Sequence, residues 1–129
     1  MEERRTLRAP ALDPAAVEPR IGSDYPIRFR AMVASRERRR LGDALGLKNF
    51  GVNLMRLPPG CASSQRHWHS RQDEFVYVVA GEVVLVSDGG ESTRLEKVRA
   101  IADWPPVQRR SGPGDLVAAG ATLCDVGDD

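Results

Sequence analysis

The stretch EFVYVVAGEVVLVSDGGESTRL, residues 74–95, constrains the fold more than any other part of the chain. Its two runs rich in β-branched residues, EFVYVVA and EVVLVS, predict strands, because such side chains suit a pleated, half-buried surface. Ala80-Gly81-Glu82 predicts a tight turn between them. Asp88-Gly89-Gly90-Glu91 predicts a hairpin turn that leads into a further strand, Ser92–Leu95. Connections this short join antiparallel neighbours, so the stretch predicts a β-meander.

The residues before this stretch predict two more strands and an extended arm. NFGVNLMRL alternates Phe50, Val52 and Leu54 on one face, as a strand does. IRFRAMVA, residues 27–34, alternates in the same way and predicts a half-buried strand. The following RERRRLGDALGLKN predicts a loop with one helical turn. Residues 1–26 hold four prolines, which prevent a continuous helix, so they predict an extended N-terminal arm.

After Leu95 the periodic pattern weakens. Lys97–Trp104 fits a short helix or a strand, and DLVAAGATLCDV is one weak apolar segment near the end of the chain. The chain is 129 residues long, which fits a single domain. We therefore expect a β domain over residues 27–129, in which 27–95 is well patterned and 96–129 is irregular.

Composition excludes several classes of protein. The net charge is +1, which gives no general attraction to nucleic acids or membranes. No apolar run approaches the ~20 residues of a spanning helix, and the charged N-terminus lacks the apolar core of a signal peptide. A soluble cytoplasmic protein without a membrane partner is the expectation. Cys61 and Cys124 are far apart and form no CxxC motif, which favours free thiols.

The basic run Arg36-Glu37-Arg38-Arg39-Arg40 allows two interpretations. The first is a patch that binds nucleic acid or phosphate. The second is a solvated loop or the end of a helix. No nucleic-acid recognition motif and no interleaved aromatic residue accompany it, which favours the second interpretation. Nucleic acid is therefore not an expected partner.

The chain's two histidines, His67 and His69, lie two residues apart, and Glu74 follows at the start of a predicted strand. Residues at i and i+2 of a strand point to the same face, so the two imidazoles would lie side by side. If residues 70–73 form a turn, Glu74 folds back beside them. Two histidines and a carboxylate with open positions suit Fe, Mn, Zn or Ni. The other interpretation is a solvated pair of surface histidines.

The residues that flank the histidines resemble the first motif of the cupin superfamily, G-x5-HxH-x3,4-E-x6-G. Here the motif begins at Gly60, has one extra residue before the first histidine, and ends at Gly81. The stretch RHWHSRQDEFVYVVAGEVVLV is similar to small single-domain bacterial cupins. The resemblance implies an all-β fold, a cupin-like antiparallel β-barrel or jelly roll. It also implies that His67, His69 and Glu74 are metal ligands and that Gly81 is a hairpin glycine.

The second cupin motif, G-x5-P-x-G-x2-H-x3-N, is degenerate or missing here. Its nearest match lies at residues 113–120, PGDLVAAG, and Leu123 then stands where the fourth ligand, a histidine, is expected. Cys124 is a candidate additional ligand, although a small buried or tail cysteine is the simpler interpretation. Few residues follow Cys124, so we expect a barrel that is incomplete at its C-terminal end. The faces of Val76/Val78 and Val83/Leu85 would then be partly uncovered.

Three explanations of the incomplete barrel stay open. The chain would complete itself as a homodimer, residues 96–129 would pack over the opening, or the reading frame has shifted near Leu95. Three functions also stay open: a metal-dependent oxygenase or isomerase acting on a small molecule, a non-catalytic ligand-binding or regulatory module, or an impaired protein. Gln65 and Arg71 flank the predicted metal site and are candidates for binding an anionic substrate. The fold alone does not decide between enzyme and binding module.

Overall fold

The computed structural model of the chain describes residues 8–64, 73–86, 92–96, 100–103 and 115–127. Most of the described residues belong to one antiparallel sheet of seven strands or to the short helices beside it. The strands are β1 (Arg20–Ile21), β2 (Glu37–Arg40), β3 (Gly51–Leu57), β4 (Glu74–Val86), β5 (Ser92–Glu96), β6 (Ala100–Asp103) and β7 (Asp115–Gly127). The helices are the single-turn 3-10 helices η1 (Pro14–Ala16), η2 (Ile27–Phe29) and η3 (Ala31–Val33), and the α-helix α1 (Leu41–Ala44).

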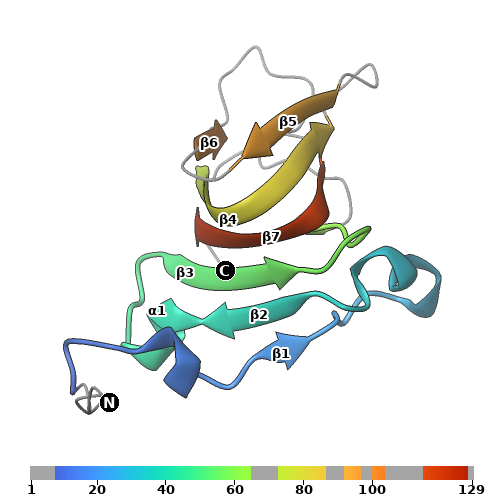
Figure 1. The fold of residues 1–129 in the computed structure, drawn as a ribbon. Helices are drawn as coiled ribbons and strands as arrows, with labels where there is room; N and C mark the ends of the chain where they lie inside the picture. Colours follow the sequence, from blue (N-terminus) through green and yellow to red (C-terminus); the bar gives the residue numbers. More distant parts are fainter. Residues whose placement is uncertain (1–7, 65–72, 87–91, 97–99, 104–114, 128–129) are drawn as a thin grey trace, which may run out of the picture.

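The strands lie in the order β1-β2-β3-β7-β4-β5, and β6 pairs with the first half of β4 (Figure 1). The order begins at β1 and ends at β5, and the described strands do not close into a barrel. The expected all-β, antiparallel and incomplete fold is confirmed. β4 and β5 pair from Val86↔Ser92 onward, so the predicted hairpin arms are confirmed, whereas its turn at 88–91 lies outside the described residues.

The predicted tight turn at Gly81 is wrong. β4 runs without reversal through this glycine, and the chain turns only after Val86. Its pairing with β7 shifts register between Val78 and Ala80 and again between Gly81 and Val83. Gly81 has a φ of +77°, a backbone conformation that other L residues rarely adopt. The glycine therefore marks an irregularity within a long strand, where a β-bulge bends it, rather than a change of direction.

The C-terminal segment, expected to be irregular, is a central strand. β7 lies between β3 and β4, and Figure 1 shows it, in red, in the middle of the sheet. It pairs with β3 from Gly51↔Gly127 to Leu57↔Ala121 and with β4 from Glu74 to Val86. The residues of such a strand predict it only weakly, because packing against the neighbouring strands, rather than intrinsic β-propensity, stabilises it.

This strand also corrects the expectation that apolar faces stay uncovered. Val76, Val78 and Val83 are buried, and Leu85 packs against the same cluster. The core is aliphatic, as the low aromatic content requires. Its buried members are Met55, Leu57, Cys61, Val76, Val78, Val83, Ala121 and Leu123. Cys61 and Cys124 are free thiols, as predicted.

The strand predicted from NFGVNLMRL is confirmed as β3, but its more deeply buried face is the opposite one. Gly51, Asn53, Met55 and Leu57 are buried, whereas Phe50 is 48% exposed. Both faces of this strand carry apolar residues, so alternation alone could not identify the core side. Pairing with β7 determines which face of β3 is buried, because it places Met55 opposite Leu123.

The strand predicted over 27–34 is also wrong. The segment forms η2 and η3, closed by the hydrogen bonds Arg30 N to Ile27 O (3.2 Å) and Val33 N to Arg30 O (3.1 Å). Val33 is buried, but Ile27 is 82% exposed, so the alternation did not mark one buried face. The next segment contains the predicted helical turn, α1, and a strand that was not predicted, β2.

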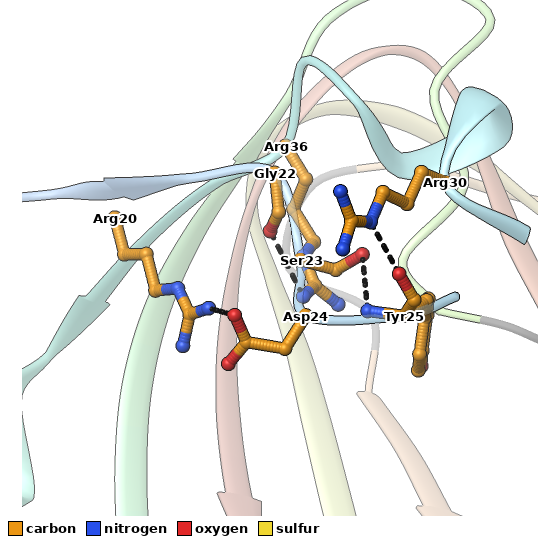
Figure 2. Close-up of polar contacts among 7 residues, drawn as sticks. All are labelled: Arg20, Gly22, Ser23, Asp24, Tyr25, Arg30 and Arg36. Atoms are coloured by element: carbon orange, nitrogen blue, oxygen red, sulfur yellow. Dashed lines mark hydrogen bonds and ion pairs between the residues drawn. The ribbon is translucent and has the colours of Figure 1, made fainter. Parts of the chain in front are cut away.

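The basic run 36–40 is mainly a strand rather than a solvated loop, and its last residue, Arg40, is the N-cap of α1. Its first residue, Arg36, is buried and donates hydrogen bonds to the Gly22 carbonyl oxygen (3.2 Å) and to the Ser63 carbonyl oxygen. Figure 2 shows the Arg36–Gly22 bond together with other polar contacts of residues 20–30, among them the Arg20–Asp24 ion pair. Arg36 thereby connects, through these hydrogen bonds, the residue after β1 with the segment that follows β3. The remainder of the run forms β2 and pairs with β3.

Candidate metal site

One face of the sheet carries the core residues Met55, Val78 and Leu123, and we call it the core face. Residues directly opposite one another in an antiparallel sheet share a face, and so do residues two apart in one strand. Asp125 lies opposite Asn53 of β3 and Val76 of β4. By the same pairing, these residues belong to the core face. A polar group therefore lies beside an aliphatic core.

Glu74 joins this polar group. It opens β4 opposite Gly127 of β7, and no register shift separates it from Val76 and Val78. The side chains of Glu74 and Asp125 share a hydrogen bond, so two carboxyl groups from strands far apart in sequence lie in contact. Gly127 packs closely here, since a Cβ atom at that position would lie 3.3 Å from the Asp73 carbonyl oxygen and 3.5 Å from Glu74 Cγ.

The environment of Asp125 disfavours its negative charge. Burial raises the pKa of the Asp125 carboxyl to about 7, and the neighbouring Glu74 carboxylate adds to this increase. The positive charge of Arg38 and a hydrogen bond with Asn53 act in the opposite direction. The buried Asp125 Oδ1 atom has no hydrogen-bond partner among the residues that the structure describes. A buried acceptor of this kind is costly unless a donor or a cation satisfies it.

Two further polar residues of the core face come from β2 and β3. Asn53 is 4% exposed and hydrogen-bonds Asp125. Arg38 lies opposite Met55, which places it on the core face, and its positive charge acts on Asp125. The site thus combines two carboxyl groups, one amide and one guanidinium group.

The predicted ligands are only partly described. Glu74 lies on the core face, whereas His67 and His69 lie outside the described residues, as do the candidate substrate-binding residues Gln65 and Arg71. Within the described ranges, no group of three or more His, Cys, Asp and Glu side chains could hold a metal ion. The predicted three-ligand set therefore stays a prediction.

The structure does not bring Cys124 to Glu74. Cys124 pairs with Leu54 and Tyr77, and strand alternation places all three on the face opposite the core face. Burial raises the pKa of the Cys124 thiol, and the charge of Asp125 adds to this effect, so the metal-binding thiolate form is disfavoured. Leu123, at the expected histidine position, is fully buried in the core.

Sequence reasoning missed Asp125, Asn53 and Arg38. A signal existed for the first: Asp125 lies two residues after the expected histidine position, hence on the same strand face. Asn53 is the polar residue on the buried face of β3, among Gly51, Met55 and Leu57, which is a recognisable anomaly once that face is known. Nothing in the arginine run distinguished Arg38 before its pairing was known.

Comparisons with known proteins agree with the fold and extend over the C-terminal segment. The Cupin domain family model matches residues 53–98. A sugar phosphate isomerase from a cupin superfamily of Silicibacter pomeroyi is 45% identical, with a TM-score of 0.83, and the match covers 93% of this chain and 76% of that one. The structural match covers 93% of this chain, whereas the family model ends at residue 98.

Two structures of lower identity share the fold. A predicted oxalate decarboxylase from Thermotoga maritima is 17% identical, with a TM-score of 0.64, over 92% of this chain and 97% of that one. A polyketide cyclase from Streptomyces resistomycificus is 19% identical, with a TM-score of 0.65, over 98% of this chain and 77% of that one. No curated protein is a significant match. None of the helices in the described residues has the length and apolar character needed to cross a membrane.

Proposed function

Because the chain belongs to the cupin superfamily, we propose that it is a metal-dependent isomerase acting on a phosphorylated sugar. In this proposal His67, His69 and Glu74 hold the metal ion. The sugar phosphate isomerase from Silicibacter pomeroyi, at 45% identity, supports the reaction class. The observation that carries the proposal is the polar group of Glu74, Asp125 and Asn53 beside the aliphatic core.

The residues that are described suit a divalent cation at this place. Two carboxyl groups in contact, one with a buried oxygen that lacks a hydrogen-bond partner among the described residues, form an environment that a positive ion would stabilise. Neutral imidazoles and carboxylates are ligands of Fe, Mn, Zn and Ni. When bound, such a metal polarises carbonyl and hydroxyl oxygens of a sugar.

The chain's own residues would bind and orient the substrate. Arg38 places a guanidinium group on the core face, and guanidinium groups bind phosphate through paired hydrogen bonds. Gln65 and Arg71 flank the histidines in sequence and are proposed to contact the same anionic substrate. Val76 and Val78 form an apolar surface next to the carboxyl pair, which would strengthen polar contacts by excluding water.

Metal analysis and turnover test this proposal in sequence. The purified protein is stripped of metal, reloaded separately with Fe(II), Mn(II), Zn(II) or Ni(II), and analysed for bound metal. We expect close to one ion per chain, lost in His67→Ala and His69→Ala. The loaded protein is then incubated with a panel of aldose and ketose phosphates in D2O, and interconversion is followed by proton NMR.

The outcomes separate the candidate functions. Interconversion of one pair, lost in both histidine variants, supports the isomerase. Bound metal and saturable binding of a sugar phosphate without turnover would point to the non-catalytic binding module instead. Folded wild-type protein that binds none of the four metals would rule out the metal-dependent mechanism.

A further inference from the structure

We propose that Asp125 is a ligand of the metal, in place of the histidine that the second cupin motif would supply. The inference rests on the metal site proposed above and adds a residue that the sequence pattern does not assign. The chain has no third histidine, and Leu123, at the expected position, has no donor atom in its side chain. A fourth ligand from the chain would therefore have to come from another position.

The topology of β7 identifies that position. Of the residues next to Leu123, Cys124 belongs to the opposite face of the sheet. Asp125 is the next residue on the core face, and its carboxyl group is in hydrogen-bond contact with that of Glu74. A metal ion bound by both carboxylates would lie between Glu74 and Asp125, because these side chains share one face of the sheet and are in contact. A shift of one residue would exchange Asp125 for Cys124 or Val126.

The neighbours of Asp125 leave one oxygen available. Asn53 and Glu74 hydrogen-bond its carboxyl group, while the buried Oδ1 atom has no hydrogen-bond partner among the described residues. Asn53 is itself buried, so the bond to Asp125 holds the carboxyl group in one orientation. Residues that orient a ligand in this way are a regular part of protein metal sites. Asn53 is therefore a positioning residue and Asp125 the ligand.

The proposed ligand set has consequences for the choice of metal. Two imidazoles and two carboxylates carry a total charge of −2, which neutralises a divalent ion. A set with three imidazoles and one carboxylate would carry −1. Replacing an imidazole by a carboxylate favours harder ions, so Mn(II) and Fe(II) gain relative to Ni(II) and Cu(II). We expect the affinity for Ni(II) relative to Mn(II) to be lower in the wild type than in Asp125→His.

Asp125→Asn tests the ligand role, with Asp73→Asn as a matched control. Asp125→Asn removes a carboxylate that contacts Glu74 in space. Asp73→Asn removes the carboxylate that precedes Glu74 in sequence, and Asp73 is exposed. The asparagine at 125 has the size of the neutral acid that burial favours, so the metal-free variant is expected to fold. Binding of Mn(II) is measured by titration calorimetry. Loss of an outer partner of a metal ligand costs about 10–100-fold in affinity, and loss of Asp125 should cost at least that much.

Co(II) substitution gives a second readout that does not depend on activity. Visible absorption of bound Co(II) responds to the number and type of its ligands, so Asp125→Asn should change the spectrum while Asp73→Asn leaves it unchanged. An affinity and a spectrum equal to those of the wild type in Asp125→Asn would overturn the ligand role and leave the site of His67, His69 and Glu74 intact. Wild-type protein that binds no metal would overturn both proposals. Metal binding that depends on Asp125, without sugar phosphate turnover, would support the ligand role and overturn only the isomerase.

Discussion

Gly81→Ala is the substitution whose cost follows most directly from the structure. Gly81 lies where the backbones of β4 and β7 are in close contact, between two shifts of the β4–β7 register. A Cβ atom built on this glycine would overlap the carbonyl oxygen of Gly120 and would lie 2.9 Å from the Cα atom of Ala121. Both are backbone atoms of a strand that is paired on either side. Neither strand can move away without breaking pairing elsewhere.

The expected cost has two parts. A non-glycine residue at a φ of +77° costs about 1–2 kcal/mol. Displacing a packed backbone adds about 1–3 kcal/mol or more. Gly46 separates the two parts, because it has the same φ of +77° and nothing lies within 4 Å of its Cβ position. Gly46→Ala should therefore show the conformational cost alone, and Gly81→Ala should exceed it by at least about 1 kcal/mol.

Urea unfolding of the metal-free protein, followed by circular dichroism, measures both variants against the wild type. At about 4 °C per kcal/mol, we also expect the melting temperature of Gly81→Ala to fall by roughly 10 °C or more. Failure of this variant to fold is the extreme form of the same result. Equal destabilisation by Gly81→Ala and Gly46→Ala would refute the close approach of β4 and β7 at Gly81.

Two further predictions concern buried polar groups. Burial raises the pKa of Asp125 from 3.8 to about 7, so the fold binds more protons than the unfolded chain between these values. The free energy of unfolding of the metal-free wild type, relative to that of Asp125→Asn, should therefore fall by up to about 4 kcal/mol from pH 4 to about pH 8 and level off above. A difference that does not change with pH would contradict this. Arg36→Ala should lower the free energy of unfolding in urea by about 2–4 kcal/mol, because two carbonyl groups lose a buried donor. Arg56→Ala, which removes the exposed ion pair with Glu37, should lower it by less than about 1 kcal/mol. Equal costs for the two variants would contradict this.

Local patterns predicted three of the strands well. The strands of β3, the two halves of β4, and β5 follow from β-branched residues and from the hairpin residues at 88–91. The same reasoning failed at 27–34, where alternation without burial indicated a strand and the chain forms 3-10 turns. It also failed at Gly81, since a glycine between two strand-like runs fits a turn and a bulge equally well.

Half of the candidate site could be read from the residues and half could not. Spacing alone singled out His67, His69 and Glu74, because metal ligands from one motif lie close together in sequence. Asp125 and Asn53 lie outside that motif, on two other strands, so its spacing did not include them. Cys124 attracted attention for its chemistry, yet strand alternation puts it on the wrong face.

The sequence by itself determined what is local: an antiparallel β domain, its hairpin, and a histidine pair followed by a carboxylate. These depend on side-chain shape and on contacts between near neighbours in the chain. The tertiary structure decided where β7 lies, which face of β3 is buried, and that Asp125 meets Glu74. The register between strands that are distant in sequence depends on how their side chains pack in the core. A slip of one residue moves every side chain of a strand to the other face of the sheet.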